Sequence, residues 1–219
     1  MSEIKSEEKK TDYEFYAQVA IVIVLGILLF YSFNKDSGIP GTIGTGNVIS
    51  SVSASEILPK GIPAVYGKEL GISYDDVSAS NPTLADATMA KLTEYEDMQL
   101  NSEQMTRYVK IGSMIACEYC CGAETLVFSN GQAACGCAHS YAMRGLAKYL
   151  LTKHPDMTDD QILEELGKWK VLFFPGVHEQ KAAVLKSKGI ELNYINLASN
   201  KYRGIEKGQA SGGEMVGGC

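Results

Sequence analysis

The chain contains 219 residues, of which 45% are hydrophobic, and it carries a formal net charge of -6 at pH 7. An acidic balance without a clustered basic patch argues against nucleic acid as a partner. No sequence similarity recurs at periods of about 20 to 50 residues, which excludes a solenoid or a propeller. Without its terminal segments the chain keeps roughly 150 residues, enough for one modest hydrophobic core.

The N-terminal region predicts a membrane anchor. Residues 1–15 are highly charged, and residues 16–33 read YAQVAIVIVLGILLFYSF, without a charged side chain. A helix of that length can cross about 30 Å of hydrocarbon. The apolar stretch is longer than that of a usual signal peptide, and no small-x-small cleavage site follows it. We therefore expect a retained transmembrane helix at residues 16–33, with a cleaved signal peptide as the alternative.

Lysines flank this apolar stretch unequally. Lys5, Lys9 and Lys10 precede it, whereas Lys35 is the nearby lysine that follows it. By the positive-inside rule the N-terminus then lies in the cytoplasm and the C-terminal module lies outside. The sequence therefore predicts a single-pass protein of the cell membrane.

Composition divides the rest of the chain into three parts. Residues 34–56 are rich in Gly, Ser and Thr and predict a flexible linker. Residues 57–203 predict a soluble Cys-rich module. Residues 204–219 end in GQASGGEMVGGC and predict a disordered tail.

Helical signals dominate the module. Apolar residues recur at helical spacing, and start and stop residues bound each run. The clearest start is Thr158, an N-cap with Gln161 at N3, after which Trp169 has the spacing of a core residue. We expect His154 at a helix C-terminus and His178 on the surface of a first helical turn. The expected helices cover about residues 82–97, 101–116, 138–153, 158–174 and 178–188.

Five of the six cysteines fall within a short segment that also contains a histidine. They form two clusters, Cys117-Glu118-Tyr119-Cys120-Cys121 and Cys135-Gly136-Cys137, and His139 follows two positions later. Between the clusters, residues 125–132 form an apolar, β-prone run that closes on Asn-Gly, the strongest short-range hairpin signal. The sequence therefore predicts a mainly α module with an inserted Cys-rich β-hairpin.

The ligand spacing, Cys-x2-Cys, fourteen residues, then Cys-x-Cys-x-His, resembles that of a zinc ribbon or zinc knuckle. In such a site two short ligand loops flank a β-turn and converge on one ion. Zinc takes four ligands, so two of the six main candidates must be left out. The candidate metal ligands are Cys117, Cys120, Cys121, Cys135, Cys137 and His139, with Met143 and Cys219 as accessory candidates.

Other soft-ligand chemistry is open to the same residues. Copper(I) is the second candidate, because thiolates select it and Met143 lies four residues after His139 on the same helical face. Met143 could equally be a core methionine. An iron-sulfur cluster is a third candidate, because it takes four cysteines. Cys135 and Cys137 precede a predicted helix N-terminus, which favours anionic thiolate for metal ligation and for redox chemistry alike.

Disulfides are the competing interpretation, since a module outside the cell would lie in an oxidising compartment. A bond between the neighbours Cys120 and Cys121 would be strained, so at most one of them is expected to bond directly with the other cluster. Cys117 and Cys120 could instead act as a dithiol-disulfide redox pair.

The two clusters resemble those of membrane-attached extracytoplasmic proteins named for a Pro-Cys-Tyr-Cys-Gly-Cys motif. Tyr119-Cys120, Cys135-Gly136-Cys137, the downstream histidine and the helical surroundings match, over about residues 108–175. Ala116 replaces the proline, a longer segment splits the cysteines, and no cysteine is placed for lipid attachment. The resemblance implies a thiol-rich role for which metal binding is one candidate, and it names no reaction.

Motifs typical of common enzymes are missing from the sequence. It contains no isolated carboxylate pair, no phosphate-cradling glycine motif, and no G-x-S-x-G, H-E-x-x-H or C-x-x-C-H sequence. These absences favour a binding protein over an enzyme. The sequence therefore predicts a membrane-anchored protein that binds zinc before copper, and the alternative is a membrane-tethered thiol-disulfide redox protein.

Overall fold

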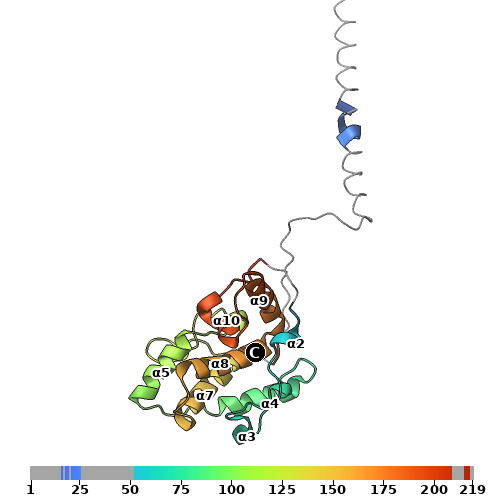
Figure 1. Cartoon of the computed structure of the whole chain (residues 1–219). Coiled ribbons are helices and arrows are strands. Elements are labelled where there is room, and N and C mark those ends of the chain that lie inside the picture. Colours follow the sequence, from blue (N-terminus) through green and yellow to red (C-terminus); the bar gives the residue numbers. More distant parts are fainter. Residues whose placement is uncertain (1–15, 17, 20, 26–51, 209–214, 218–219) are drawn as a thin grey trace, which may run out of the picture. The chain divides into compact units, whose positions relative to one another are not determined.

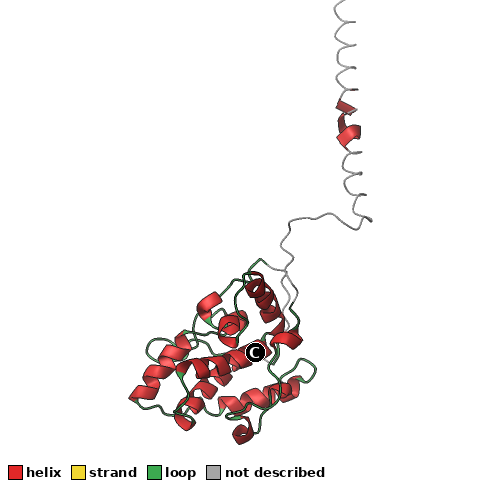
Figure 2. Cartoon of the chain, viewed as in Figure 1, coloured by secondary structure: helices red, strands yellow, loops and turns green. Residues whose placement is uncertain are grey.

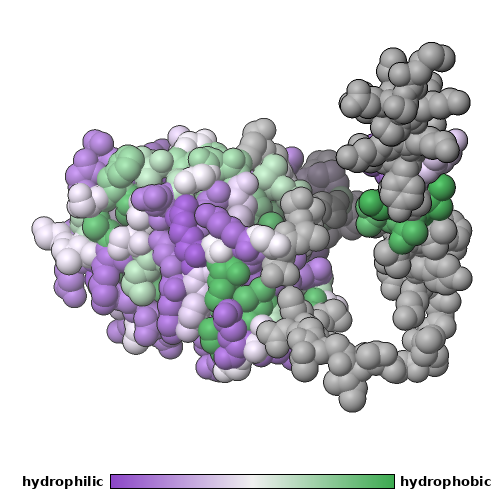
Figure 3. All heavy atoms as spheres, turned by 90° about the horizontal axis from the view of Figure 1, so that it is seen from above, coloured by the Kyte–Doolittle hydropathy of each residue, from purple (hydrophilic) through white to green (hydrophobic). Residues whose placement is uncertain are grey.

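The computed structural model describes residues 16, 18–19, 21–25, 52–208 and 215–217. The chain divides into two compact units, Met1–Gly46 and Asn47–Cys219, and each is described by itself. In the first unit the described residues are helical, and the Ile, Val and Leu side chains of residues 21–25 are exposed and hydrophobic (Figure 3).

The predicted transmembrane helix is not supported. No helix among the described residues is long and apolar enough to cross a membrane. About 20 helical residues are needed for that crossing, and residues 17, 20 and 26–33 of the predicted span lie outside the described part of the chain. This finding contradicts the transmembrane helix at residues 16–33 and, with it, the single-pass location at the cell membrane.

The second unit is built from helices (Figure 1). In chain order they are α2 (Ala54–Ile57), α3 (Gly67–Leu70), η1 (Tyr74–Asp76), α4 (Pro82–Thr93), α5 (Ser102–Ser113), α6 (Glu118–Cys121), α7 (Ala138–Lys153), α8 (Asp159–Phe173), α9 (Pro175–Ser187), α10 (Tyr194–Ala198) and η2 (Asn200–Tyr202). α7 packs against α4, α5 and α8, and α10 packs against α8 and α9. The two longest helices, α7 and α8, therefore form the centre of the unit.

Local capping signals account for the helix starts. Asn81 and Asn101 accept backbone N–H groups at the starts of α4 and α5, and Thr158 forms the predicted capping box with Gln161 at the start of α8. The prediction of a helix over residues 138–153 is confirmed by α7. α9 begins at Pro175, before the predicted start, because proline suits the first helical position.

The predicted β-hairpin is wrong. Among the described residues there is no strand (Figure 2), and Val127 meets Ala133 in an isolated antiparallel bridge. The turn itself is present, with Gly131 at a φ of 82°. The backbone N–H of Leu126, however, donates to the carbonyl of Gly112 at 2.9 Å, and both Leu126 and Val127 are buried. This segment therefore packs onto the end of α5 instead of forming a two-stranded ladder.

The core is centred on α8. Trp169 is fully buried, as predicted, and its Nε1 donates to the hydroxyl of Tyr66 at 2.6 Å. Tyr66 in turn donates to Glu165, and the ring of Tyr74 lies 5.3 Å from that of Trp169. Residues before α4 are thereby attached to the same core as the later helices.

Gly145 allows α7 to lie directly against α4. A Cβ atom at this position would collide with the backbone carbonyl of Leu92. Gly145→Ala should therefore lower the free energy of unfolding by about 1–3 kcal/mol, because the collision involves backbone that cannot turn away. Urea unfolding measures the change. Gly136→Ala is the control, since a Cβ there meets no atom within 4 Å, and an equal loss in both variants would contradict this packing argument.

Candidate metal centre

A single helical turn, α6, gathers the first three cysteines. Cys117 is its N-cap, and Cys120 and Cys121 are its last two residues. Positions i, i+3 and i+4 of a helix share one face, so the three thiols lie on the same side. Gly122 ends the turn with a φ of 71°, a left-handed conformation that glycine adopts without strain.

Ion pairs hold this turn against the rest of the module. Glu118 Oε1 lies 3.0 Å from Nζ of the buried Lys170, and Glu118 Oε2 lies 3.0 Å from Nε of Arg203. Lys170 also donates to the carbonyl of Ala198 at 2.9 Å. Burial acts to raise the pKa of Glu118, but the charge of Lys170 helps to hold that pKa below its ordinary value. α6 is therefore fixed at the residue next to Cys117.

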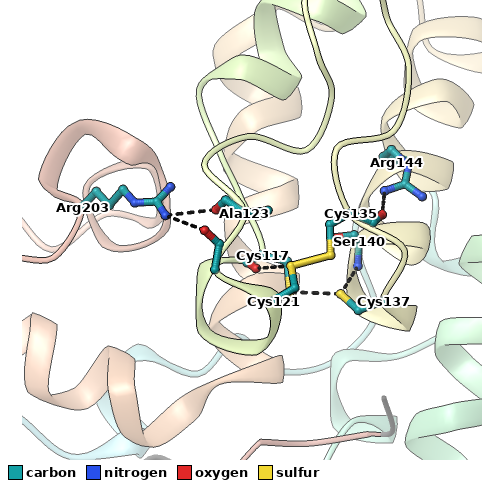
Figure 4. The surroundings of a disulfide bond; sticks show 9 residues. Cys117, Cys121, Ala123, Cys135, Cys137, Ser140, Arg144 and Arg203 are labelled. Atoms are coloured by element: carbon teal, nitrogen blue, oxygen red, sulfur yellow. Dashed lines mark hydrogen bonds between the residues drawn. A yellow bond between two sulfur atoms is a disulfide. The ribbon is translucent and has the colours of Figure 1, made fainter.

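The start of α7 positions the second cluster. Cys137 is the N-cap of this helix, and its Sγ accepts the backbone N–H of Ser140 at 3.4 Å. The buried Arg144 donates to the carbonyl of Cys135 at 2.7 Å (Figure 4). These contacts hold the second cluster beside α6.

Cys121 and Cys135 form a disulfide between the two clusters, with Cα atoms 6.9 Å apart (Figure 4). One member of the vicinal pair thus bonds across to the other cluster, in agreement with the sequence argument. Among the described residues, Cys117 and Cys137 are free thiols, and their Sγ atoms lie 3.4 Å apart. The centre therefore combines a disulfide with adjacent free thiols.

The two free thiols differ strongly in acidity. The hydrogen bond with Cys117 is the main cause that lowers the pKa of Cys137 to about 3, and His139 and Ser140 act in the same direction. The same hydrogen bond, together with burial, raises the pKa of Cys117 far above its ordinary value. Cys137 is therefore the thiolate of the pair, and Cys117 keeps its proton.

Ligand atoms gather around Cys137 in two groups. In the first group the Sγ atoms of Cys117, Cys121 and Cys137 all lie within 4.8 Å of one another. In the second group the same limit covers Cys120, Cys137 and a ring nitrogen of His139. Cys121 lies in the Cys121–Cys135 disulfide, and Cys120 is disulfide-bonded as well, so each group offers all its ligands only when the protein is reduced.

His139 is fully buried in the first turn of α7. Its Nε2 lies 2.9 Å from the carbonyl oxygen of Val216, and the rings of Phe173 and Phe174 lie 4.8 and 4.9 Å from its own ring. Nδ1 has no hydrogen-bond partner in the described part of the chain. A neutral imidazole that donates from one nitrogen carries a lone pair on the other, which is the form that binds a metal.

The remaining predicted site residues have three different outcomes. Cys135 lies in the disulfide and in neither ligand group. Met143 is fully buried in the hydrophobic core, so the core interpretation of this methionine holds. Cys219 lies outside the described residues.

The other two histidines have structural positions. His154 is the C-cap of α7, as predicted. The prediction of a surface position for His178 is wrong, because this side chain is fully buried and its Nδ1 lies 2.7 Å from the carbonyl of Phe174. α9 begins earlier than predicted, which places His178 in a turn that faces the interior.

Sequence reasoning missed the residues that support the thiols. Lys170 follows Trp169 in the apolar stripe of α8, and a lysine on such a face is itself a signal for a buried ion pair. Its partner Glu118 lies inside the first cysteine cluster. Nothing in the sequence indicates that Val216 contacts His139, because only the fold brings this tail residue to the histidine.

Lys181 is a second buried lysine, and it interacts electrostatically with Lys170 and Glu118. Lys181 is fully buried, and its Nζ has no hydrogen-bond partner among the described residues. Burial and the charge of Lys170 lower the pKa of Lys181 to about 8; Glu118 and Glu206 act to raise that pKa, and Arg203 acts to lower it. The folded pKa is therefore below the 10.5 of the free side chain.

Lys181→Met should raise the free energy of unfolding at pH 7 by roughly 2 kcal/mol, because it removes a cation that burial disfavours. Between about pH 8 and 10.5 the unfolded natural chain binds more protons than the folded chain, so stability rises with pH there. The variant should lack that rise. Urea unfolding across this range measures both effects, and equal pH slopes for the two proteins would contradict the assignment.

Neither protein-family models, nor curated proteins, nor solved structures give a match to this chain. Its function therefore has to follow from the geometry and chemistry of the site.

Proposed function

We propose that this protein, once its disulfides are reduced, binds a zinc ion through Cys120, Cys137 and His139. The observation that carries the proposal is the position of Cys137, whose Sγ lies within 4.8 Å of both the Cys120 Sγ and a ring nitrogen of His139. Thiolate and neutral imidazole are the ligands that structural zinc sites use. Six candidate ligands are thereby reduced to a smaller set, because Cys117, Cys121 and Cys135 are not part of this group.

The spacing of the ligand atoms suits a tetrahedral ion. Zinc–sulfur bonds of about 2.3 Å place two ligand sulfurs roughly 3.8 Å apart. The limit of 4.8 Å within the group of Cys120, Cys137 and His139 is close to that value. After reduction of Cys120, small side-chain movements would close the site around zinc.

Zinc suits this group better than its rivals. Met143 is a core residue, which weakens the argument for copper(I) from a nearby thioether. An iron-sulfur cluster requires four cysteines, and neither ligand group among the described residues contains more than three. A mixed Cys and His set is common for zinc.

Elemental analysis of the reduced full-length protein after equilibration with zinc should find about one zinc per chain. Cys120→Ser and His139→Gln should each weaken zinc binding by more than about 100-fold, since loss of an outer contact alone can cost that much. His154→Gln is the matched control, because this residue lies at the C-terminal end of α7 and its Nε2 contacts Glu69. A protein without zinc, or variants with unchanged affinity, would refute the proposal.

A thiol-disulfide role is the second candidate. Cys137 Sγ lies within 4.8 Å of Cys121 Sγ, so the Cys137 thiolate can attack the Cys121–Cys135 bond. A Cys121–Cys137 bond would form, Cys135 would leave as a thiolate, and no net electrons would be transferred. The geometry thus supports exchange at Cys137, in place of the Cys117–Cys120 pair that the spacing suggested.

Disulfide mapping by mass spectrometry distinguishes this role. Incubation with a small dithiol should yield a measurable fraction of the Cys121–Cys137 bond before full reduction. If Cys121–Cys135 does not exchange and the reduced protein binds zinc, the redox role is excluded and only the metal-binding role remains.

A further inference from the structure

Two thiols and a disulfide lie together where α6 meets the start of α7 (Figure 4). Cys121 and Cys135 form the disulfide, while Cys117 and Cys137 are free thiols with Sγ atoms 3.4 Å apart. The Sγ atoms of Cys117, Cys121 and Cys137 all lie within 4.8 Å of one another. The disulfide is therefore within reach of two thiols that can form a second disulfide with each other.

These cysteines differ in their access to solvent. Cys121 is exposed, Cys135 and Cys137 are half-buried, and Cys117 is fully buried. A disulfide or thiol that arrives from outside the protein therefore meets the Cys121–Cys135 pair first. The buried Cys117 can exchange only with the sulfurs that the fold places beside it.

The surroundings of Cys137 suit an attacking thiolate. This residue is the N-cap of α7, a helix of 16 residues, and its Sγ accepts the backbone N–H of Ser140. Backbone N–H groups at a helix N-terminus stabilise an anionic sulfur. Cys137 is therefore placed to exchange with the Cys121 sulfur and then to bond with Cys117.

We propose that these four cysteines form a disulfide relay, in which Cys117 and Cys137 supply two electrons to the exposed pair. The substrate is an accessible disulfide, in a polypeptide or in a small molecule. The proposal rests on the exchange at Cys137 described above as the second candidate function, and it does not require zinc. It adds to that exchange a second step, a source of electrons and a class of substrate.

The relay begins with two internal exchange steps. In the first step the Cys137 thiolate bonds to the Cys121 sulfur, and Cys135 leaves as a thiolate. In the second step the Cys117 sulfur bonds to that of Cys137, Cys121 leaves as a thiolate, and the Cys117 proton passes to Cys135. No electrons enter or leave the protein. The disulfide now lies at the buried pair, and the exposed pair is a dithiol.

The exposed dithiol then reduces the substrate. The Cys121 thiolate bonds to one substrate sulfur, and the other substrate sulfur leaves as a thiolate. Cys135 displaces the first substrate sulfur, passes its proton to a released sulfur and restores the Cys121–Cys135 disulfide. The substrate disulfide thus gains two electrons and one proton, which the chain loses as it keeps the Cys117–Cys137 bond. An external dithiol is needed to return the chain to its first state.

Disulfide mapping of the full-length protein, incubated in chelator without added thiol, tests the internal steps. A measurable fraction of chains should contain a Cys117–Cys137 bond together with Cys121 and Cys135 as thiols that react with an alkylating reagent. In Cys117→Ser the exchange should stop at the Cys121–Cys137 bond. Met143→Leu is the control, because it changes a buried core side chain of α7 without a large change in volume and removes no thiol. Natural protein that stops at the Cys121–Cys137 bond would refute the relay while the exchange at Cys137 stands.

The substrate step is tested in chelator with an excess of two separate probes, oxidised glutathione and a cyclic peptide closed by one disulfide. Each natural chain should reduce about one probe disulfide, after which mapping should find both Cys117–Cys137 and Cys121–Cys135 bonds. Cys117→Ser should retain the probe in a mixed disulfide and reduce none of it completely. Reduction of one probe and not the other identifies the source of the substrate disulfide. If natural protein reduces neither probe, the assignment is overturned, whatever the reduced protein shows in the separate measurement of zinc.

Discussion

In the reduced protein, Cys137→Ser is expected to abolish zinc binding, whereas Cys117→Ser is expected to leave about one zinc per chain. The difference follows from geometry: Cys137 belongs to both groups of ligand atoms, while Cys117 belongs only to the group that lacks His139. A serine hydroxyl keeps its proton near pH 7 and cannot replace a thiolate. Elemental analysis gives the amount of bound zinc, and chelator competition gives the affinity.

The two variants control for each other. Each replaces a thiol of the same hydrogen-bonded pair by a hydroxyl, so a general loss of stability should be similar in both. Circular dichroism in the absence of metal shows whether each variant folds. Zinc binding with natural affinity in Cys137→Ser would contradict the central position of this thiolate. Loss of zinc in Cys117→Ser alone would assign the ion to the other ligand group.

Reduction gives the same centre a second test. Opening the Cys121–Cys135 disulfide returns Cys121 to the first ligand group, with Cys117 and Cys137. A reduced protein could then hold more metal than the disulfide-bonded protein. Comparison of the two forms by mass spectrometry under non-denaturing conditions therefore reports whether both groups bind.

Most of the helical fold could be predicted from the sequence, because its determinants are local. Thr158 with Gln161 and Asn101 with Gln104 form capping boxes that act within one turn of their own helices. The hairpin could not be excluded in this way. Asn-Gly correctly predicted a turn. The two-stranded ladder does not form, because Leu126 instead bonds to Gly112, a contact that only the packed fold provides.

The candidate site was predictable in its residue types and not in its connections. Thiols and an imidazole at short spacing identify soft ligands without further knowledge. The spacing could not show that Cys121 pairs with Cys135, because the packed fold brings together two cysteines that are 14 positions apart in the sequence. The contact of Val216 with His139 could not be predicted either, because the two residues are 77 positions apart in the sequence.

Arg144→Met is expected to cause the largest loss of stability outside the thiols, about 3 kcal/mol. Arg144 is fully buried, its Nε lies 2.6 Å from Glu96 Oε1, and its guanidinium lies 4.6 Å from the ring centre of Tyr141. The variant leaves Glu96 and the carbonyl of Cys135 without this donor. Some water can reach Glu96, whose side chain is 19% exposed, so the loss should fall at the lower end for a broken buried pair.

Urea unfolding measures that loss, and Lys186→Met is the control. The Lys186–Glu56 pair is about half exposed on each side, so its removal should change stability by less than about 1 kcal/mol. Arg144 also holds the carbonyl of Cys135, so Arg144→Met should speed reduction of the Cys121–Cys135 disulfide by a small dithiol. Equal stability of both variants would show that Arg144 contributes no more than a surface charge. An unchanged reduction rate in a destabilised variant would separate its support of the core from its support of the cysteine loop.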